Sequence, residues 1–86
     1  MPEINLDVME MNLKYFGILS EITGRPDEWL ESPAETVGEL LEELNAKYPA
    51  MKLVPCQVSV NQKLAERVSV LRKGDEIAIL PPFSGG

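Results

Sequence analysis

An amphipathic segment at residues 36–48 constrains the fold most strongly, because it predicts one main helix. Thr36 and Glu39 have the spacing of a capping box, in which the threonine side chain accepts a hydrogen bond from a free amide of the first turn. Pro49 ends the helix, since proline lacks the backbone donor. The apolar residues of the segment fall on one stripe, formed by Val37, Leu40, Leu41, Leu44 and Tyr48. Such a stripe has to be covered, so we expect the helix to pack against other elements.

The segments on either side of this helix alternate between apolar and polar residues, as strands do. The pattern of residues 27–31 does not show which of its two faces is inward, and residues 64–70 are left unassigned. Several strands with one long helix predict an α+β fold, with the helix on one face of a sheet. We expect strands at 11–16, 27–31, 58–61 and 77–80, a short helix ending at Gly24, and turns at 61–63 and 73–75.

Two apolar side chains are predicted to point away from the core. In the first strand Phe16 alternates out of phase with Met11, Leu13 and Tyr15, and in the last strand Leu80 is out of phase with Ile77 and Ile79. If these two strands are neighbours, Phe16 and Leu80 form an apolar patch, which often marks a partner site. The alternative is that both side chains cover a small core beneath a loop.

The sequence ends in Pro81-Pro82-Phe83-Ser84-Gly85-Gly86. Neither proline can donate to a strand ladder, so we expect the last strand to stop at Leu80 and a flexible tail to follow. Glycine has no Cβ, and two in succession can carry a carboxylate into a narrow channel of a partner. This arrangement favours a carrier whose cargo is attached at its own C-terminus. The alternative is a disordered end, which is common in proteins.

Composition excludes several classes of function. A net charge of −6 argues against nucleic acid as a partner, because its binders need a basic surface. No apolar run approaches the length of a membrane span, and residues 1–10 do not resemble a secretion signal, so we expect no membrane association and a cytoplasmic location. With no histidine and one cysteine, the chain cannot form a usual zinc site or a Ser-His nucleophile, so we expect no metal site and no enzymatic activity of the chain on its own. Cys56 is expected to be a buried structural thiol.

Three segments resemble a known family. Asn61-Gln62-Lys63-Leu64, Gly74-Asp75-Glu76-Ile77 and the terminal Pro-Pro-Phe-Ser-Gly-Gly are similar to the small, sulfur-carrying subunit of molybdopterin synthase, one of the ubiquitin-like sulfur carriers. The glycine-containing turn alone is a weak signal, whereas the proline pair and Gly-Gly end at the right distance beyond it are more specific. Lys14-Tyr15-Phe16-Gly17 and Thr36-Val37-Gly38-Glu39-Leu40 extend the resemblance to residues 11–86.

The resemblance implies a ubiquitin-like β-grasp fold with a mixed sheet and one main helix on one face. It divides the chain into a loose extension (1–10), the folded domain (11–80) and the functional tail (81–86). It also implies that an activating enzyme consumes ATP to adenylate the carboxylate of Gly86, and that sulfur then displaces AMP to leave a thiocarboxylate. No cofactor would be bound permanently. Residues implied to give the tail its access are Pro81, Pro82, Phe83, Ser84 and Gly85.

The implied partners are the large synthase subunit, in a heterotetramer, a ubiquitin-activating-like adenylyltransferase and a sulfur donor. The large subunit would use the sulfur to make the dithiolene of molybdopterin. Phe16, Leu64 and Leu80 match an apolar docking surface of the family. Alternatives are a sulfur carrier for thiamine synthesis or tRNA thiolation, a protein conjugated to lysines, and a binding module without any carrier role.

Overall fold

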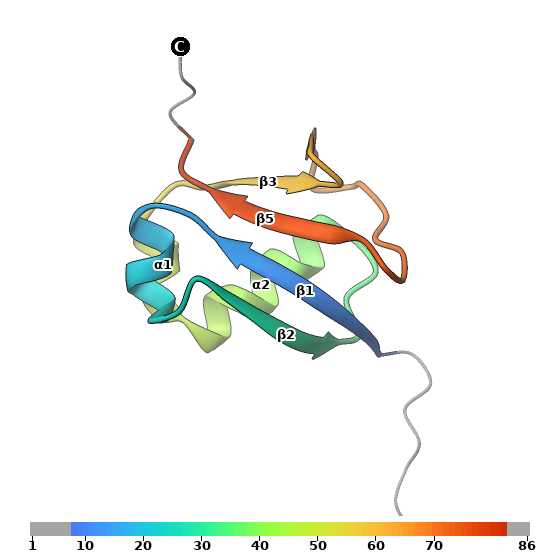
Figure 1. The fold of residues 1–86 in the computed structure, drawn as a ribbon, viewed down its shortest axis with the longest axis horizontal. Helices are drawn as coiled ribbons and strands as arrows, with labels where there is room; N and C mark the ends of the chain where they lie inside the picture. The colour runs from blue at the N-terminus through green and yellow to red at the C-terminus, as the bar shows by residue number, and fades with distance from the viewer. Residues whose placement is uncertain (1–7, 83–86) are drawn as a thin grey trace, which may run out of the picture.

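The computed structural model describes residues 8–82. They form a mixed five-stranded sheet in the order β2-β1-β5-β3-β4 (Figure 1). The strands are β1 (Met9–Tyr15), β2 (Asp27–Ser32), β3 (Gln57–Val60), β4 (Lys63–Ala65) and β5 (Glu76–Leu80). The helices are α1 (Ile18–Thr23), α2 (Val37–Lys47) and the 3₁₀ helix η1 (Pro49–Leu53). The predicted α+β fold with one main helix is confirmed.

The first and last strands lie side by side in the middle of the sheet. β1 and β5 run parallel, with Tyr15 opposite Ile79, whereas β1–β2, β5–β3 and β3–β4 are antiparallel. β1 begins at Met9, which pairs with Ser32 of β2. The predicted N-terminal extension is therefore too long, because Met9 and Glu10 belong to the sheet. Residues 1–7 lie outside the described part of the chain.

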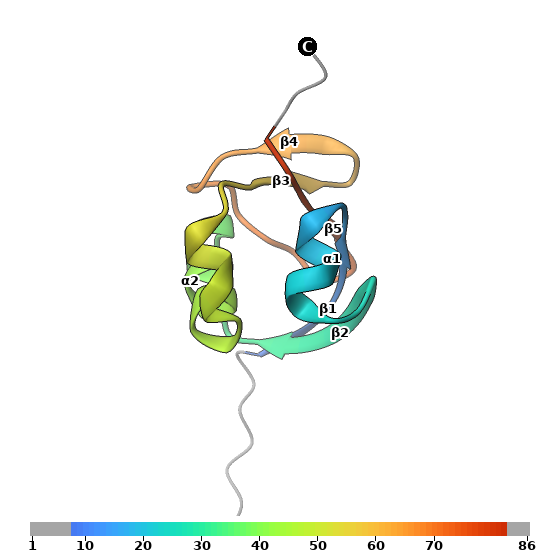
Figure 2. The same ribbon diagram turned by 90° about the vertical axis from the view of Figure 1, so that its left-hand side faces the viewer.

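The main helix starts as its sequence predicts. The Thr36 hydroxyl accepts a hydrogen bond from the Glu39 amide at 3.3 Å, and the Glu39 carboxylate accepts one from the Glu35 amide at 2.7 Å. The predicted end is also confirmed, since α2 stops at Lys47 just before Pro49. Pro49 then opens η1, which the sequence pattern did not predict. Figures 1 and 2 show α2 lying against the inner face of a sheet that curls around it.

The core lies between this inner face and the helices. Leu13, Ile77 and Ile79 contribute fully buried side chains from the two central strands, and Leu40 and Leu44 contribute them from α2. Side chains alternate along a strand, so the strand residues that alternate with these inward positions, such as Lys14 and Ala78, point to the opposite side of the sheet. This side is called the outer face below.

The unassigned segment after residue 63 completes the sheet and supports the start of α2. Asn61 and Gln62, both with positive φ, form the two-residue turn between β3 and the short β4. Farther on, the Val37 amide donates to the Ser69 carbonyl at 3.0 Å and the Gly38 amide to the Arg67 carbonyl at 2.8 Å. None of the helices within residues 8–82 is long and apolar enough to cross a membrane.

Candidate functional site

Phe16 and Leu80 lie together on the outer face, as their alternation predicts. Lys14 is opposite Ala78 in the parallel pair of β1 and β5. Two residues farther along each strand, on the same face, Phe16 therefore lies next to Leu80. The Phe16 amide continues the ladder by donating to the Ile79 carbonyl at 3.1 Å. Phe16 remains 47% exposed and Leu80 is half-buried. The two side chains therefore form a surface patch and are not part of the core.

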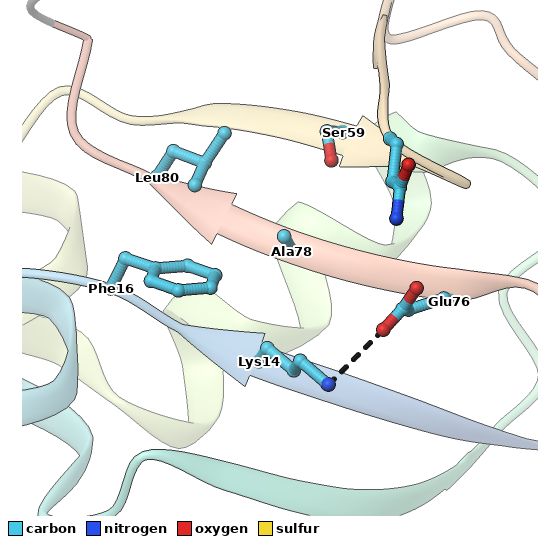
Figure 3. A pocket seen from close by; sticks show the side chains of 7 residues that line it. Lys14, Phe16, Ser59, Glu76, Ala78 and Leu80 are labelled. Atoms are coloured by element: carbon cyan, nitrogen blue, oxygen red, sulfur yellow. Dashed lines mark ion pairs between the residues drawn. The ribbon is translucent and has the colours of Figure 1, made fainter.

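This patch borders a hollow of about 280 Å³ in the outer face. Ala78 lies at its centre, and its short side chain leaves open the space between the larger side chains around it (Figure 3). Lys14 and Glu76 form an ion pair at 3.1 Å opposite the patch, and both side chains are nearly half exposed, so water weakens their attraction. The hollow is lined by Lys14, Phe16, Ser59, Gln62, Glu76, Ala78 and Leu80.

The start of the tail is held beside this hollow. Gly17 has a φ of +61°, and a Cβ added there would lie 3.0 Å from the Pro81 side chain. Glycine is thus needed both for the backbone conformation and for the close approach of Pro81. β5 ends at Leu80, as the proline pair predicts, and Pro81 is half-buried. Phe83, Ser84, Gly85 and Gly86 lie outside the described residues, so the roles expected of them stay predictions.

Leu64, the third expected docking residue, is not part of this hollow. It lies opposite Ser59 on β4 and is 67% exposed. It borders a separate hollow of about 270 Å³ near the N-terminal half of α2, together with Cys56 and Leu41. Cys56 is half-buried, and this burial raises the pKa of its thiol, which disfavours a reactive thiolate.

β2 turns a glutamate inward, which sequence reasoning missed. Glu28 is buried, while Trp29 points outward and is 67% exposed. The Glu28 carboxylate accepts hydrogen bonds from the Tyr15 hydroxyl at 2.8 Å, the Tyr48 hydroxyl at 2.5 Å and the Lys47 ammonium at 2.6 Å. This cluster around the buried Glu28 carboxylate joins β1 and β2 to the end of α2. No local signal indicated it, because the three donors lie 13 to 20 residues from Glu28 in the chain.

The same cluster changes the partner expected for Lys47. The helical spacing allowed an ion pair with Glu43, but Lys47 pairs with Glu28, and Glu43 accepts a hydrogen bond from Ser32. Burial by itself raises the pKa of the Glu28 carboxyl, but hydrogen bonds from Lys47, Tyr48 and Tyr15 outweigh it and hold that pKa below its usual value. Its hydrogen bond to Glu28 raises the pKa of Lys47. Glu28 is thus a buried, fully bonded anion with a structural role.

Within residues 8–82, the outer-face hollow is lined by apolar, hydroxyl and amide side chains and one lysine–glutamate ion pair, which offer contact to a partner. Ser59 has no histidine to activate it, because the chain contains none. Within residues 8–82 no group of three metal-ligating side chains comes together. An apolar patch beside a hollow, next to the end of β5, is suited to docking a partner protein.

Both the sequence and the fold of this chain are similar to those of known proteins. The sulfur carrier subunit of molybdopterin synthase from Mycobacterium tuberculosis is 36% identical over 83 residues, covering 92% of this chain and all of its own. The small archaeal modifier protein 1 of Methanosarcina acetivorans superposes with a TM-score of 0.75 at 29% identity, covering 92% of this chain and 98% of that one.

A third relative was solved together with a partner. The complex of subunits 1 and 2 of the molybdopterin-converting factor from Helicobacter pylori contains a chain that matches with a TM-score of 0.64 and 27% identity. The match covers 91% of this chain and 100% of that one. These neighbours confirm the ubiquitin-like β-grasp fold. The ThiS family profile matches residues 13–86. The chain therefore belongs to the ThiS family, and its curated homologues include sulfur carrier subunits of molybdopterin synthase.

Proposed function

We propose that this chain is the sulfur-carrier subunit of molybdopterin synthase and bears its sulfur as a thiocarboxylate on Gly86. The observation that supports this most is the full-length match to the mycobacterial sulfur carrier subunit. The geometry adds that β5 ends beside the Phe16–Leu80 patch, with Pro81 packed against Gly17. A partner bound to the patch would therefore receive the tail at a defined point.

The proposed chemistry compensates for the poor reactivity of a carboxylate. An oxygen of the Gly86 carboxylate attacks the α-phosphorus of ATP, and pyrophosphate leaves. A sulfur nucleophile at the oxidation level of sulfide then forms a C–S bond to the carboxyl carbon of Gly86 while the C–O bond to AMP breaks, so AMP leaves and a thiocarboxylate remains. The adenylyltransferase and the sulfur donor supply the catalytic groups, so the chain itself needs no permanently bound cofactor. We place these steps in the cytoplasm, together with transfer of the sulfur to the pterin in the large subunit.

The large subunit is the proposed occupant of the outer-face hollow. The Helicobacter pylori neighbour was solved as a complex of subunits 1 and 2, which supports a partner of this kind. Phe16 and Leu80 would supply apolar contact area, and Lys14 and Glu76 would form a polar rim. Leu64 would contact the partner only if its surface extends across β3 to β4.

The position of the terminal carboxylate provides the decisive test. Deleting Gly86 moves that carboxylate back by one residue, about 3.3–3.6 Å. Because a misplacement of only about 1 Å can cost on the order of 10²-fold in rate, single-turnover sulfur transfer to the large subunit should collapse. The melting temperature should stay the same, since the last residues of a domain usually contribute few packing contacts. Normal transfer by the truncated chain would refute Gly86 as the carrier residue.

A second candidate function is covalent attachment to other proteins. The likeness to the Methanosarcina acetivorans modifier protein, at 29% identity, favours it specifically. Both functions begin with adenylation at Gly86, but they differ in the product. If the chain is a sulfur carrier, mass analysis of the protein isolated from its host would show that sulfur has replaced one carboxyl oxygen. If the chain is a modifier, the analysis would show it joined by isopeptide bonds to lysines of other proteins.

A further inference from the structure

The edge of the sheet at β2 has backbone groups available for another strand. The strand order places β2 at one end, and residues 8–82 contribute no strand beyond it (Figure 1). The Tyr15 amide donates to the Pro26 carbonyl at 2.8 Å, which fixes the phase of the β1–β2 ladder. The backbone amides and carbonyls of successive residues alternate in direction along an antiparallel strand. Those of Asp27, Trp29 and Glu31 therefore point away from β1.

The side chains of these three residues lie on the outer face in the order acidic, aromatic, acidic. Trp29, in the middle, is one of the most exposed large apolar side chains of the described residues. Two hollows meet at it, of about 230 Å³ and 650 Å³. Charged residues commonly protect a sheet edge against pairing with another strand, whereas an exposed tryptophan at the centre of such an edge promotes pairing. The edge therefore disfavours strands that carry acidic residues beside Asp27 and Glu31, and it favours strands whose charges are complementary.

One pair of like charges beside Trp29 is unfavourable in the isolated chain, and Lys73, which lines the same hollow, forms no ion pair with it within the described residues. Glu10 of β1 lies directly opposite Glu31 of β2 on the outer face, and like charges in this arrangement destabilise a sheet. Neither carboxylate forms an ion pair within the described residues. Residues 1–7 contain no lysine or arginine. A cation brought to Glu31 from outside would relieve this repulsion.

The pattern also argues against a second copy of the chain. Two β2 strands paired antiparallel about Trp29 would place Asp27 of each copy opposite Glu31 of the other. Both cross-strand pairs would repel, and each copy adds a net charge of −6. The same edge is complementary to a strand with basic residues at the two outer positions and an apolar residue between them.

We propose that the β2 edge binds an extended basic segment of a partner protein as an added strand. The segment has the outward pattern basic–apolar–basic. Its basic side chains pair with Asp27 and Glu31, and its apolar residue covers Trp29. The pattern reads the same in both directions, so it suits parallel or antiparallel addition. β1 separates this edge from β5, which leaves the Phe16–Leu80 patch free for another partner at the same time.

A short peptide on the full-length chain tests the proposal. The probe Thr-Arg-Thr-Leu-Thr-Arg-Thr presents the required pattern, and Thr-Glu-Thr-Leu-Thr-Glu-Thr is its charge-reversed control. Trp29 is the single tryptophan, so its fluorescence reports directly on the edge. We expect the arginine peptide to shift the emission to shorter wavelength and to slow amide exchange at Asp27, Trp29 and Glu31. The glutamate peptide should do neither.

Two matched comparisons separate strand addition from general attraction between charges. Glu31→Lys should weaken binding of the arginine peptide by about tenfold, because one attraction becomes a repulsion. Glu66→Lys makes the same charge change just beyond β4, at the other end of the sheet, and should leave the affinity unchanged. An arginine peptide with N-methylated amides on its pairing edge keeps its charge but cannot form the ladder, so it should not bind. Binding by the methylated peptide, equal weakening by both substitutions, or no response to the arginine peptide would overturn the proposal.

Discussion

The two faces of the sheet carry residues from the same strands but differ in what covers them. On β5, Ile77 and Ile79 point inward and are fully buried against the helices, while Ala78 and Leu80 point outward and border an open hollow. The inner face even buries a charge, that of Glu28, because two tyrosines and Lys47 bond to it. The outer face leaves Phe16 and Trp29 exposed.

The difference shows how a small chain separates stability from recognition. Burial of apolar side chains provides most of the stabilising free energy, and in this chain it is concentrated on the inner face. The outer face can therefore carry apolar and charged groups chosen for contact with partners. If this separation holds, substitutions on the inner face should lower stability, and those on the outer face should alter binding.

The largest expected effect comes from two neighbouring residues of β5. Ile79→Ala removes a fully buried side chain and should lower the free energy of unfolding by about 2–5 kcal/mol. Leu80→Ala, one position along and on the other face, should cost less than about 1 kcal/mol, because Leu80 is only half-buried. Urea unfolding of both variants measures the contrast. Equal losses would show that the outer face also belongs to the core.

The buried charge should give the next largest effect and a dependence on pH. Glu28→Gln keeps the shape but removes charged hydrogen bonds, at a cost of about 1.5–3 kcal/mol. The folded state lowers the pKa of Glu28, so its contribution is present above the usual glutamate value of 4.5 and is lost as the pH falls through the folded value. The melting temperatures of wild type and variant should therefore converge in acid. The exposed Glu21→Gln is the control, and a constant gap between wild type and Glu28→Gln across this range would contradict the assignment.

Gly17 tests the boundary between the two faces, where the tail begins. Gly17→Ala should destabilise the fold by about 1–3 kcal/mol, since alanine is strained at positive φ. Gly24→Ala provides the control, because Gly24 also has positive φ but a Cβ there meets nothing within 4 Å. Both variants should lose stability, measured by thermal melts. Only Gly17→Ala should also slow sulfur transfer, because it displaces Pro81, and equal transfer rates would argue against this role of the contact.

The smallest effect on stability is expected from the outer-face patch, where the effect on binding should be large. Phe16→Asp should change the free energy of unfolding by no more than about 0.5 kcal/mol. It should weaken binding to the large subunit by at least about thirtyfold if Phe16 is a central contact. Ile18→Asp is a matched control, because Ile18 is similarly exposed (44%) but does not line the hollow. Calorimetric titration with the large subunit measures both, and unfolding of the Phe16 variant would place Phe16 in the core.

Local rules in the sequence determined the elements whose signals are short-range. The cap at Thr36, the apolar stripe and Pro49 specify α2 almost to the residue, because helical hydrogen bonds join positions close in the chain. The alternation of Phe16 and Leu80, and the end of β5 before Pro81, were predicted in the same way. The Phe16–Leu80 patch of the candidate docking site therefore followed from the sequence, although the hollow beside it did not.

Only the tertiary structure decided which face of β2 turns inward. Alternation divides the strand into Asp27, Trp29 and Glu31 on one side and Glu28, Leu30 and Ser32 on the other, and hydropathy does not choose between them. The choice depends on Tyr15 and Tyr48, which satisfy the Glu28 carboxylate only after β1, β2 and α2 have come together. A buried charge is tolerated only with such partners. Because these partners are distant in the chain, no local pattern could reveal either the buried Glu28 or the exposed Trp29.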